Sequence, residues 1–125
     1  MPNGSHRLVA VVDDDDAVRE SLRFLLEIAG YPVATYGSAA HFLHDAPIDE
    51  LACVVVDQHM PEQTGLQLVS HLRGQGVALP VALITGSPSP DLIRQAHELN
   101  VMKVLEKPLD DDVLFEFIER ASDRL

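Results

Sequence analysis

The stretch L-V-A-V-V-D-D-D-D-A-V-R (residues 8–19) joins five apolar residues, four consecutive aspartates and the start of a helix-like pattern. A continuous apolar run of this length is typical of a strand that is buried on both faces of a sheet. The aspartates repel one another, and two carboxylates ~4 Å apart cost about 4 kcal/mol near a protein surface. A bound divalent cation would offset part of that repulsion. The stretch therefore predicts a buried strand that ends at a cation site and leads into a helix.

The same alternation of apolar run and amphipathic segment continues to the end of the chain. The expected strands are Leu8–Val12, Val33–Tyr36, Leu51–Val56, Pro80–Thr85 and Met102–Leu105. The segments that follow them carry apolar residues at helical spacing, which predicts helices packed on a sheet. These residues are Val18, Leu22, Leu25, Leu26 and Ala29, then Phe42 and Leu43, then Leu66, Val69 and Leu72, then Leu92, Ile93, Ala96 and Leu99, and finally Val113, Leu114, Phe117, Ile118 and Ala121.

Local signals mark where the expected helices begin and end. Ser38 and Ser89 have the form of N-caps, Thr64–Gln67 has capping-box form, and Asp110–Asp112 cap the last helix. Gly30 stops the first helix. Five strands alternating with five helices predict an α/β fold with a five-stranded parallel sheet covered on both faces. Right-handed crossovers and the chain length favour the flavodoxin-like strand order 2-1-3-4-5.

The composition limits the classes of function. The 125 residues fit a single domain, residues 1–125, and residues 1–6 are expected to be disordered or a cloning remnant. A net charge of −11 argues against direct binding of nucleic acid and suits metal cations or basic protein surfaces. A single cysteine, Cys53, indicates a reducing, cytoplasmic compartment, and no apolar run is long enough to cross a membrane.

In a doubly wound parallel sheet, ligands bind beyond the carboxyl ends of the strands. Asp13 and Asp14 follow the first expected strand, Asp57 ends the third, Thr85 ends the fourth and Lys107 follows the fifth. Taken one at a time, each has an ordinary interpretation as a helix cap, a turn residue or a solvated charge. Together, they predict one site at one edge of the sheet.

The chemistry of these groups points to phosphoryl transfer. Oxygen ligands with open coordination positions suit Mg²⁺, or a similar cation such as Mn²⁺. A carboxylate beside that metal, with an ammonium and a hydroxyl nearby, can accept a phosphoryl group in line.

The chain resembles the receiver domains of bacterial two-component response regulators from about Arg7 to the C-terminus. The resemblance rests on V-D-D, D-Q-H-M-P, I-T-G and E-K-P, which occur in the family's order and are most similar to its FixJ-type subgroup. It implies a phosphoacceptor receiver domain that takes a phosphoryl group from a histidine kinase and does not turn over as an enzyme.

The resemblance also implies a role for each matching residue. Asp57 would be the phosphoacceptor and a metal ligand, Asp14 a direct ligand of Mg²⁺ and Asp13 an acid that holds the metal mainly through water. The backbone carbonyl of His59 would complete the coordination, and its side chain is expected to face solvent. The alternative is that this side chain affects dephosphorylation, because it borders the path of the attacking water. Lys107 would pair with the acceptor, Thr85 would be the switch hydroxyl, and the Lys107-Pro108 bond is expected to be cis.

The sequence departs from the family pattern in three places. Val104 stands where the family usually has an aromatic residue that swings inward on activation. Leu99-Asn100-Val101 replaces the usual Gly-Ala, and Ser87–Pro90 places two prolines in the loop after Thr85. These departures predict a reshaped turn and a smaller rearrangement, confined to the Thr85 loop and to the face formed by the fourth helix, the last strand and the fifth helix.

That face is the expected contact for a second copy or a partner protein, with Arg94, Lys103, Glu106 and Glu116 as its charged rim. Two other functions stay open. One is a receiver-like interaction module that no longer switches. The other is a phosphatase of the haloacid dehalogenase type, which would use Asp13 and Asp15 as its D-x-D motif and need an acid from Asp110–Asp112.

Overall fold

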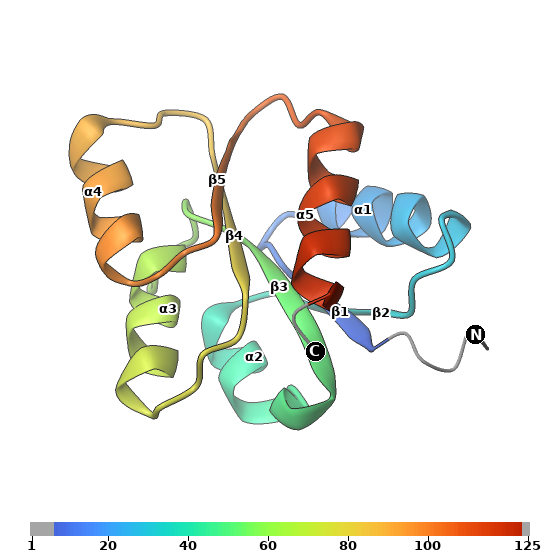
Figure 1. Cartoon of the computed structure of the whole chain (residues 1–125), viewed down its shortest axis with the longest axis horizontal. Coiled ribbons are helices and arrows are strands. Elements are labelled where there is room, and N and C mark those ends of the chain that lie inside the picture. The colour runs from blue at the N-terminus through green and yellow to red at the C-terminus, as the bar shows by residue number, and fades with distance from the viewer. Residues whose placement is uncertain (1–6, 124–125) are drawn as a thin grey trace.

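A computed structural model describes residues 7–123 as five parallel strands and five α-helices (Figure 1). The strands are β1 (Leu8–Val12), β2 (Val33–Tyr36), β3 (Leu51–Asp57), β4 (Val81–Thr85) and β5 (Lys103–Glu106). The helices are α1 (Asp16–Ile28), α2 (Ala39–Asp45), α3 (Gly65–Gly74), α4 (Pro90–Glu98) and α5 (Asp111–Asp123). The expectation for residues 1–6 lies outside the described residues.

The strand order is β2-β1-β3-β4-β5, which confirms the predicted topology. All neighbouring strands pair in parallel, so their carboxyl ends meet at one edge of the sheet. Figure 1 shows α1 and α5 on one side of the sheet and α2, α3 and α4 on the other. The arrangement places the loops after β1, β3, β4 and β5 around a common edge, hereafter the carboxyl edge.

Two apolar clusters fill the spaces between the sheet and its two helical layers. On one side, buried residues of α1 and α5 such as Leu26 and Phe117 pack on alternate residues of β1 and β3. On the other side, Phe42, Leu68 and Leu72 pack on the remaining residues of the same strands. Every residue of β3 is buried, as expected for a central strand covered on both faces.

Most helix boundaries follow the predicted caps. Asp15 caps α1 by accepting from the Val18 N–H, and Ser38, Thr64 and Ser89 cap α2, α3 and α4 in the same way. Thr64 and Gln67 form the complete capping box. After α1, Gly30 has a φ of +98°, a conformation that glycine adopts without a Cβ clash.

The structure corrects several details. Ala29 is exposed because it is the C-cap of α1, and Ile93 is half exposed on α4. A short 3₁₀-helix, Ile48–Glu50, precedes β3 and was not predicted. β4 and β5 each begin one residue later than expected. No helix among residues 7–123 is long and apolar enough to span a membrane.

Candidate functional site

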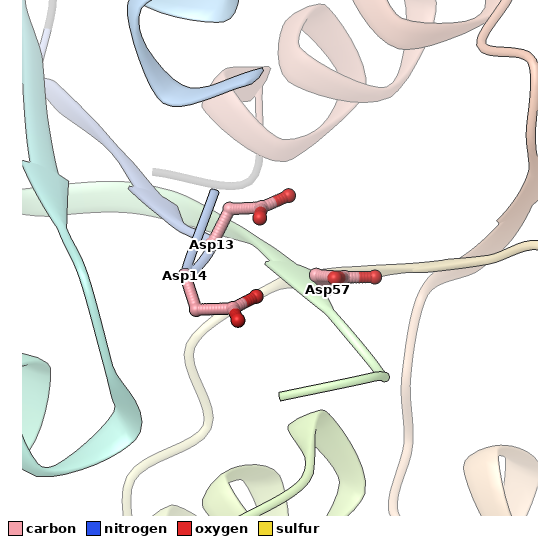
Figure 2. A group of neighbouring side chains, drawn as sticks. All are labelled: Asp13, Asp14 and Asp57. Atoms are coloured by element: carbon pink, nitrogen blue, oxygen red, sulfur yellow. The ribbon is translucent and has the colours of Figure 1, made fainter. Parts of the chain in front are cut away.

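Three carboxylates meet at the carboxyl edge (Figure 2). Asp13 and Asp14 directly follow β1, and Asp57 is the last residue of β3. An oxygen atom from each of the three lies within 4.8 Å of an oxygen of the other two. Asp13 and Asp57 are only 2% and 4% exposed, whereas Asp14 is exposed to solvent. The predicted acidic cluster is therefore present, with two buried acids and one open to solvent.

The backbone around Asp57 is fixed by close packing against α3. A Cβ atom on Gly65 would lie 2.7 Å from Cδ1 of Leu83 and 2.8 Å from the carbonyl oxygen of Asp57. Only glycine allows the start of α3 to approach the end of β3 this closely. Gln58 adds a second connection, because its side-chain oxygen accepts a hydrogen bond of 2.8 Å from the Leu66 N–H. Close packing and a hydrogen bond therefore connect the end of β3 to the start of α3.

Asp13 is held by its own loop. One of its carboxylate oxygens accepts from the Asp15 N–H at 2.9 Å, and Arg19 donates to its backbone carbonyl at 2.6 Å. Burial raises the pKa of Asp13 above its ordinary value. The hydrogen bond from Asp15 opposes that rise, and the negative charge of Asp57 adds to it. The site thus makes ionisation of Asp13 less favourable than it is in water.

Lys107 supplies positive charge to Asp57 from the loop after β5. Its ammonium lies 3.4 Å from Oδ1 of Asp57, and its side chain is 43% exposed while that of Asp57 is 5% exposed. The contact lacks hydrogen-bond geometry, so the buried Oδ1 atom has no hydrogen-bond partner among the described residues. The Lys107-Pro108 bond is cis, as expected.

The acidic cluster fits a hard divalent cation. A buried carboxylate oxygen without a hydrogen-bond partner is costly unless another group compensates it. Here Asp57, whose Oδ1 is unpartnered, belongs to a cluster with two further carboxylates, and oxygen donors with one exposed side suit Mg²⁺, which keeps several waters. The donor set therefore matches the metal that the sequence predicts.

Thr85 ends β4 and is completely buried. Its hydroxyl oxygen accepts a hydrogen bond of 3.1 Å from the Ser87 N–H. It also lies 3.2 Å from Nε2 of His59, in the loop after β3. The prediction that the His59 side chain simply faces solvent is incomplete, because this exposed residue directs one ring nitrogen at the Thr85 hydroxyl.

Sequence reasoning missed three supporting residues of the site: Gly65, Gln58 and Arg19. Gly65 stands in the capping box and was assigned only a helix start, although a glycine after a capping residue is a signal of close backbone approach. Gln58 and Arg19 carry no local signal, because their partners are backbone groups whose positions depend on the folded loops.

The acidic residues near α5 have a structural use. A carboxylate oxygen of Asp110 accepts from the backbone N–H groups of Asp112 and Val113, which caps α5. The phosphatase interpretation needed an acid from this segment for its chemistry. Capping by Asp110 leaves that interpretation without support.

The departures from the family pattern lie together beside α4. Val104 of β5 lines a groove of about 440 Å³ between α4 and β5, next to Pro88 and Met102. Asn100 adopts a left-handed φ of +57°, which asparagine tolerates better than most residues. Asn100 therefore supplies a left-handed residue in the turn before β5, and the predicted reshaping of this turn stays a prediction.

Comparison with known proteins points to one family. The profile of a family described as "Response regulator receiver domain" matches residues 9–119. The transcriptional regulatory protein FixJ of Azorhizobium caulinodans is 44% identical over 115 residues, which are 91% of this chain and 54% of that protein. The chain thus spans about half the length of this relative.

Solved structures agree with the sequence comparison. The crystal structure of FixJ-N superposes with a TM-score of 0.85 at 36% identity and covers 95% of both chains. The chemotaxis protein CheY4 of Vibrio cholerae superposes with a TM-score of 0.84 at 25% identity, over 93% of this chain and 98% of that one.

Proposed function

Because this chain belongs to the response regulator receiver domain family, we propose that Asp57 accepts a phosphoryl group from the phosphohistidine of a sensor kinase. The similarity of the chain to FixJ-type receiver domains supports a phosphoacceptor function in two-component signalling. One observation supports the choice of residue. Oδ1 of Asp57 is buried without a hydrogen-bond partner among the described residues and lies 3.4 Å from the ammonium of Lys107, and the Asp57 carboxylate also belongs to the cluster with Asp13 and Asp14.

In the proposed reaction, a carboxylate oxygen of Asp57 forms a bond to phosphorus. The bond between phosphorus and the imidazole nitrogen of the donor breaks, and its electron pair stays on that nitrogen. Lys107 lies close enough to stabilise negative charge on the transferring oxygens. Thr85 would donate its hydroxyl hydrogen to one of these oxygens once the group is attached.

We propose Asp13, Asp14, Asp57 and the backbone carbonyl of His59 as the metal ligands, with Mg²⁺ or Mn²⁺ as the cation. The bound metal would neutralise charge on the phosphoryl oxygens during transfer. Before binding, the three carboxylates outnumber the positive side chains that contact them among residues 7–123, which are Lys107 at Asp57 and Arg19 at the backbone carbonyl of Asp13. Such a concentration of negative charge attracts cations.

The remaining proposals concern the whole protein. The chain would act as a single receiver unit that accepts one phosphoryl group per cycle and does not turn over a substrate. A second copy or a partner protein would contact the face of α4, β5 and α5. In the structure, Arg94 of that face pairs with Asp91 and Glu98 on its own helix. Any partner would therefore compete with ion pairs that already exist.

Incubation with acetyl phosphate and Mg²⁺ tests the acceptor. Intact mass should show that the wild-type protein gains one phosphoryl group. Hydroxylamine should remove this group, whereas a serine phosphate would survive the same treatment. Asp57→Asn should gain none, whereas Asp49→Asn, an exposed acid before β3, should behave as wild type. Uptake by Asp57→Asn at the wild-type rate would refute the assignment, and repeated turnover of p-nitrophenyl phosphate would indicate a phosphatase.

A further inference from the structure

The contact between His59 and Thr85 joins the two loops that flank the proposed acceptor. His59 belongs to the loop after β3 and Thr85 to the end of β4, and their side chains meet at 3.2 Å although 26 positions separate them. The two strands are neighbours, with Asp57 opposite Ile84. The contact therefore links adjacent loops at the carboxyl edge through side chains.

The Thr85 hydroxyl has two hydrogen-bond partners in the structure. A threonine hydroxyl has one hydrogen to donate and two lone pairs to accept. Its oxygen accepts from the Ser87 N–H at 3.1 Å. That bond uses one lone pair, which leaves the hydroxyl hydrogen and the second lone pair for a bond with Nε2 of His59. Whichever of the two groups donates, His59 and Ser87 together fix the direction of a buried hydroxyl.

Resting on the proposed function, we infer that the His59 side chain is a positioning residue that holds the Thr85 hydroxyl in the unphosphorylated state. Movement of Thr85 toward a phosphoryl group on Asp57 breaks this hydrogen bond. A contact that exists in only one of two states shifts their equilibrium by its own free energy. One net hydrogen bond corresponds to about a two- to tenfold change in that equilibrium. His59 thus opposes activation until phosphorylation drives Thr85 to a new partner.

A double-mutant cycle separates this role from a direct effect on the phosphoryl group. The four proteins are wild type, His59→Ala, Thr85→Val and the double variant, and the ligand is beryllofluoride with Mg²⁺, followed by NMR titration. His59→Ala should tighten binding about two- to tenfold in the wild-type background and have no effect with Thr85→Val, which lacks the hydroxyl. His59→Gln, which keeps a polar terminal group, should stay close to wild type. His71→Ala, an exposed histidine on α3, is the matched control and should change nothing.

A second measurement uses the metal-free protein without any ligand. His59→Ala should lower the midpoint of urea unfolding in the wild-type background and leave the Thr85→Val protein unchanged. Equal effects of His59→Ala in both backgrounds, or no effect in either, would overturn the role of His59. Beryllofluoride binding that persists in Asp57→Asn would instead refute the proposed acceptor, so the two failures are distinguishable.

Discussion

The two ends of the parallel strands differ in how completely their polar groups are hydrogen-bonded. At the carboxyl edge, a buried carboxylate oxygen of Asp57 has no hydrogen-bond partner among residues 7–123, and burial raises the pKa of Asp13. At the amino edge, where β4 and β5 begin, the guanidinium of Arg73 donates to four backbone carbonyls. These are the carbonyls of Leu99 at 2.8 Å, Val77 at 2.8 Å, Leu79 at 3.0 Å and Asn100 at 3.2 Å.

The difference separates stability from function within one small domain. Arg73 joins the end of α3 to the turns that precede β4 and β5, so the amino edge is tied together by one side chain. At the carboxyl edge, the buried Oδ1 of Asp57 lacks a hydrogen-bond partner among the described residues. Such a group is expected where a ligand completes the site. Substitutions at the amino edge should therefore affect folding, and substitutions at the carboxyl edge should affect binding and switching.

The largest expected effect on stability is that of Arg73→Ala. Removing the guanidinium deprives four carbonyls of a charged donor, and hydrogen bonds to charged groups are strong enough to predict a loss of about 3 kcal/mol. Urea unfolding measures that loss. Phosphorylation by acetyl phosphate below the unfolding transition should still add one phosphoryl group, because Arg73 is remote from the acceptor loops.

Arg94→Ala provides the matched control for Arg73. Its guanidinium pairs with Asp91 and Glu98 on the exposed surface of α4, where ion pairs contribute little. The control should unfold close to wild type. If both arginine variants lose the same stability, the four carbonyl contacts of Arg73 do not hold the amino edge.

A smaller and opposite effect is expected for Asp13→Asn at the carboxyl edge. In the metal-free protein, the raised pKa of Asp13 means that the folded state binds more protons than the unfolded chain above the ordinary pKa of 3.8. The wild-type free energy of unfolding should therefore fall as pH rises from this value through the raised pKa, and stay lower at neutral pH. Asp13→Asn should lack this fall and be more stable at pH 7 by about 1 kcal/mol.

Added metal should reverse the order of the two proteins. At ten times its dissociation constant, Mg²⁺ stabilises a folded protein by about 1.4 kcal/mol, and Asp13→Asn should gain less because it lacks one proposed ligand. Thermal unfolding in EDTA and in Mg²⁺ measures both effects. Asp49→Asn, which removes the same charge outside the site, controls for net charge. If the stability of Asp13→Asn depends on pH as that of wild type does, ionisation of Asp13 does not destabilise the folded protein.

The sequence predicted the carboxyl edge well and the amino edge poorly. Asp13, Asp57 and Thr85 were placed at one edge because parallel strands end there, a rule that needs only the order of the apolar runs. Arg73 gave no signal, because its partners are carbonyls of turns whose positions depend on the complete fold. Helical spacing likewise identified the apolar residues of α4 that face the sheet. It did not predict that Ile93, at the margin of this apolar face, would be half exposed.

The contact between His59 and Thr85 shows why the site itself was only partly predictable. The order of the strands brings the two loops together, but it does not determine the direction of a side chain within a loop. The acidic cluster needed less detail, because Asp13, Asp14 and Asp57 stand at the ends of the neighbouring strands β1 and β3.

The smallest expected effect concerns how far activation spreads from the carboxyl edge. Val104 pairs with Leu83 in the sheet and lines the groove of about 440 Å³ between α4 and β5. A valine side chain has one χ1 torsion and no ring that could move into space left by Thr85. We therefore expect beryllofluoride to cause small changes in the amide NMR shifts of wild type, largest in the Thr85 loop and weaker on the face of α4, β5 and α5.

Val104→Tyr should extend those shifts along α4 and toward α5, because a ring can occupy the groove in one state and leave it in the other. Its stability without ligand should remain within about 1 kcal/mol of wild type, since the groove is open and the added ring displaces no core residue. Val104→Leu adds apolar volume without a ring and should respond as wild type does. Sedimentation with and without beryllofluoride then reports whether the wider change promotes self-association. If the wild-type shifts already extend as far as those of Val104→Tyr, the valine does not limit the spread, and the carboxyl edge is coupled to the rest of α4 by another route.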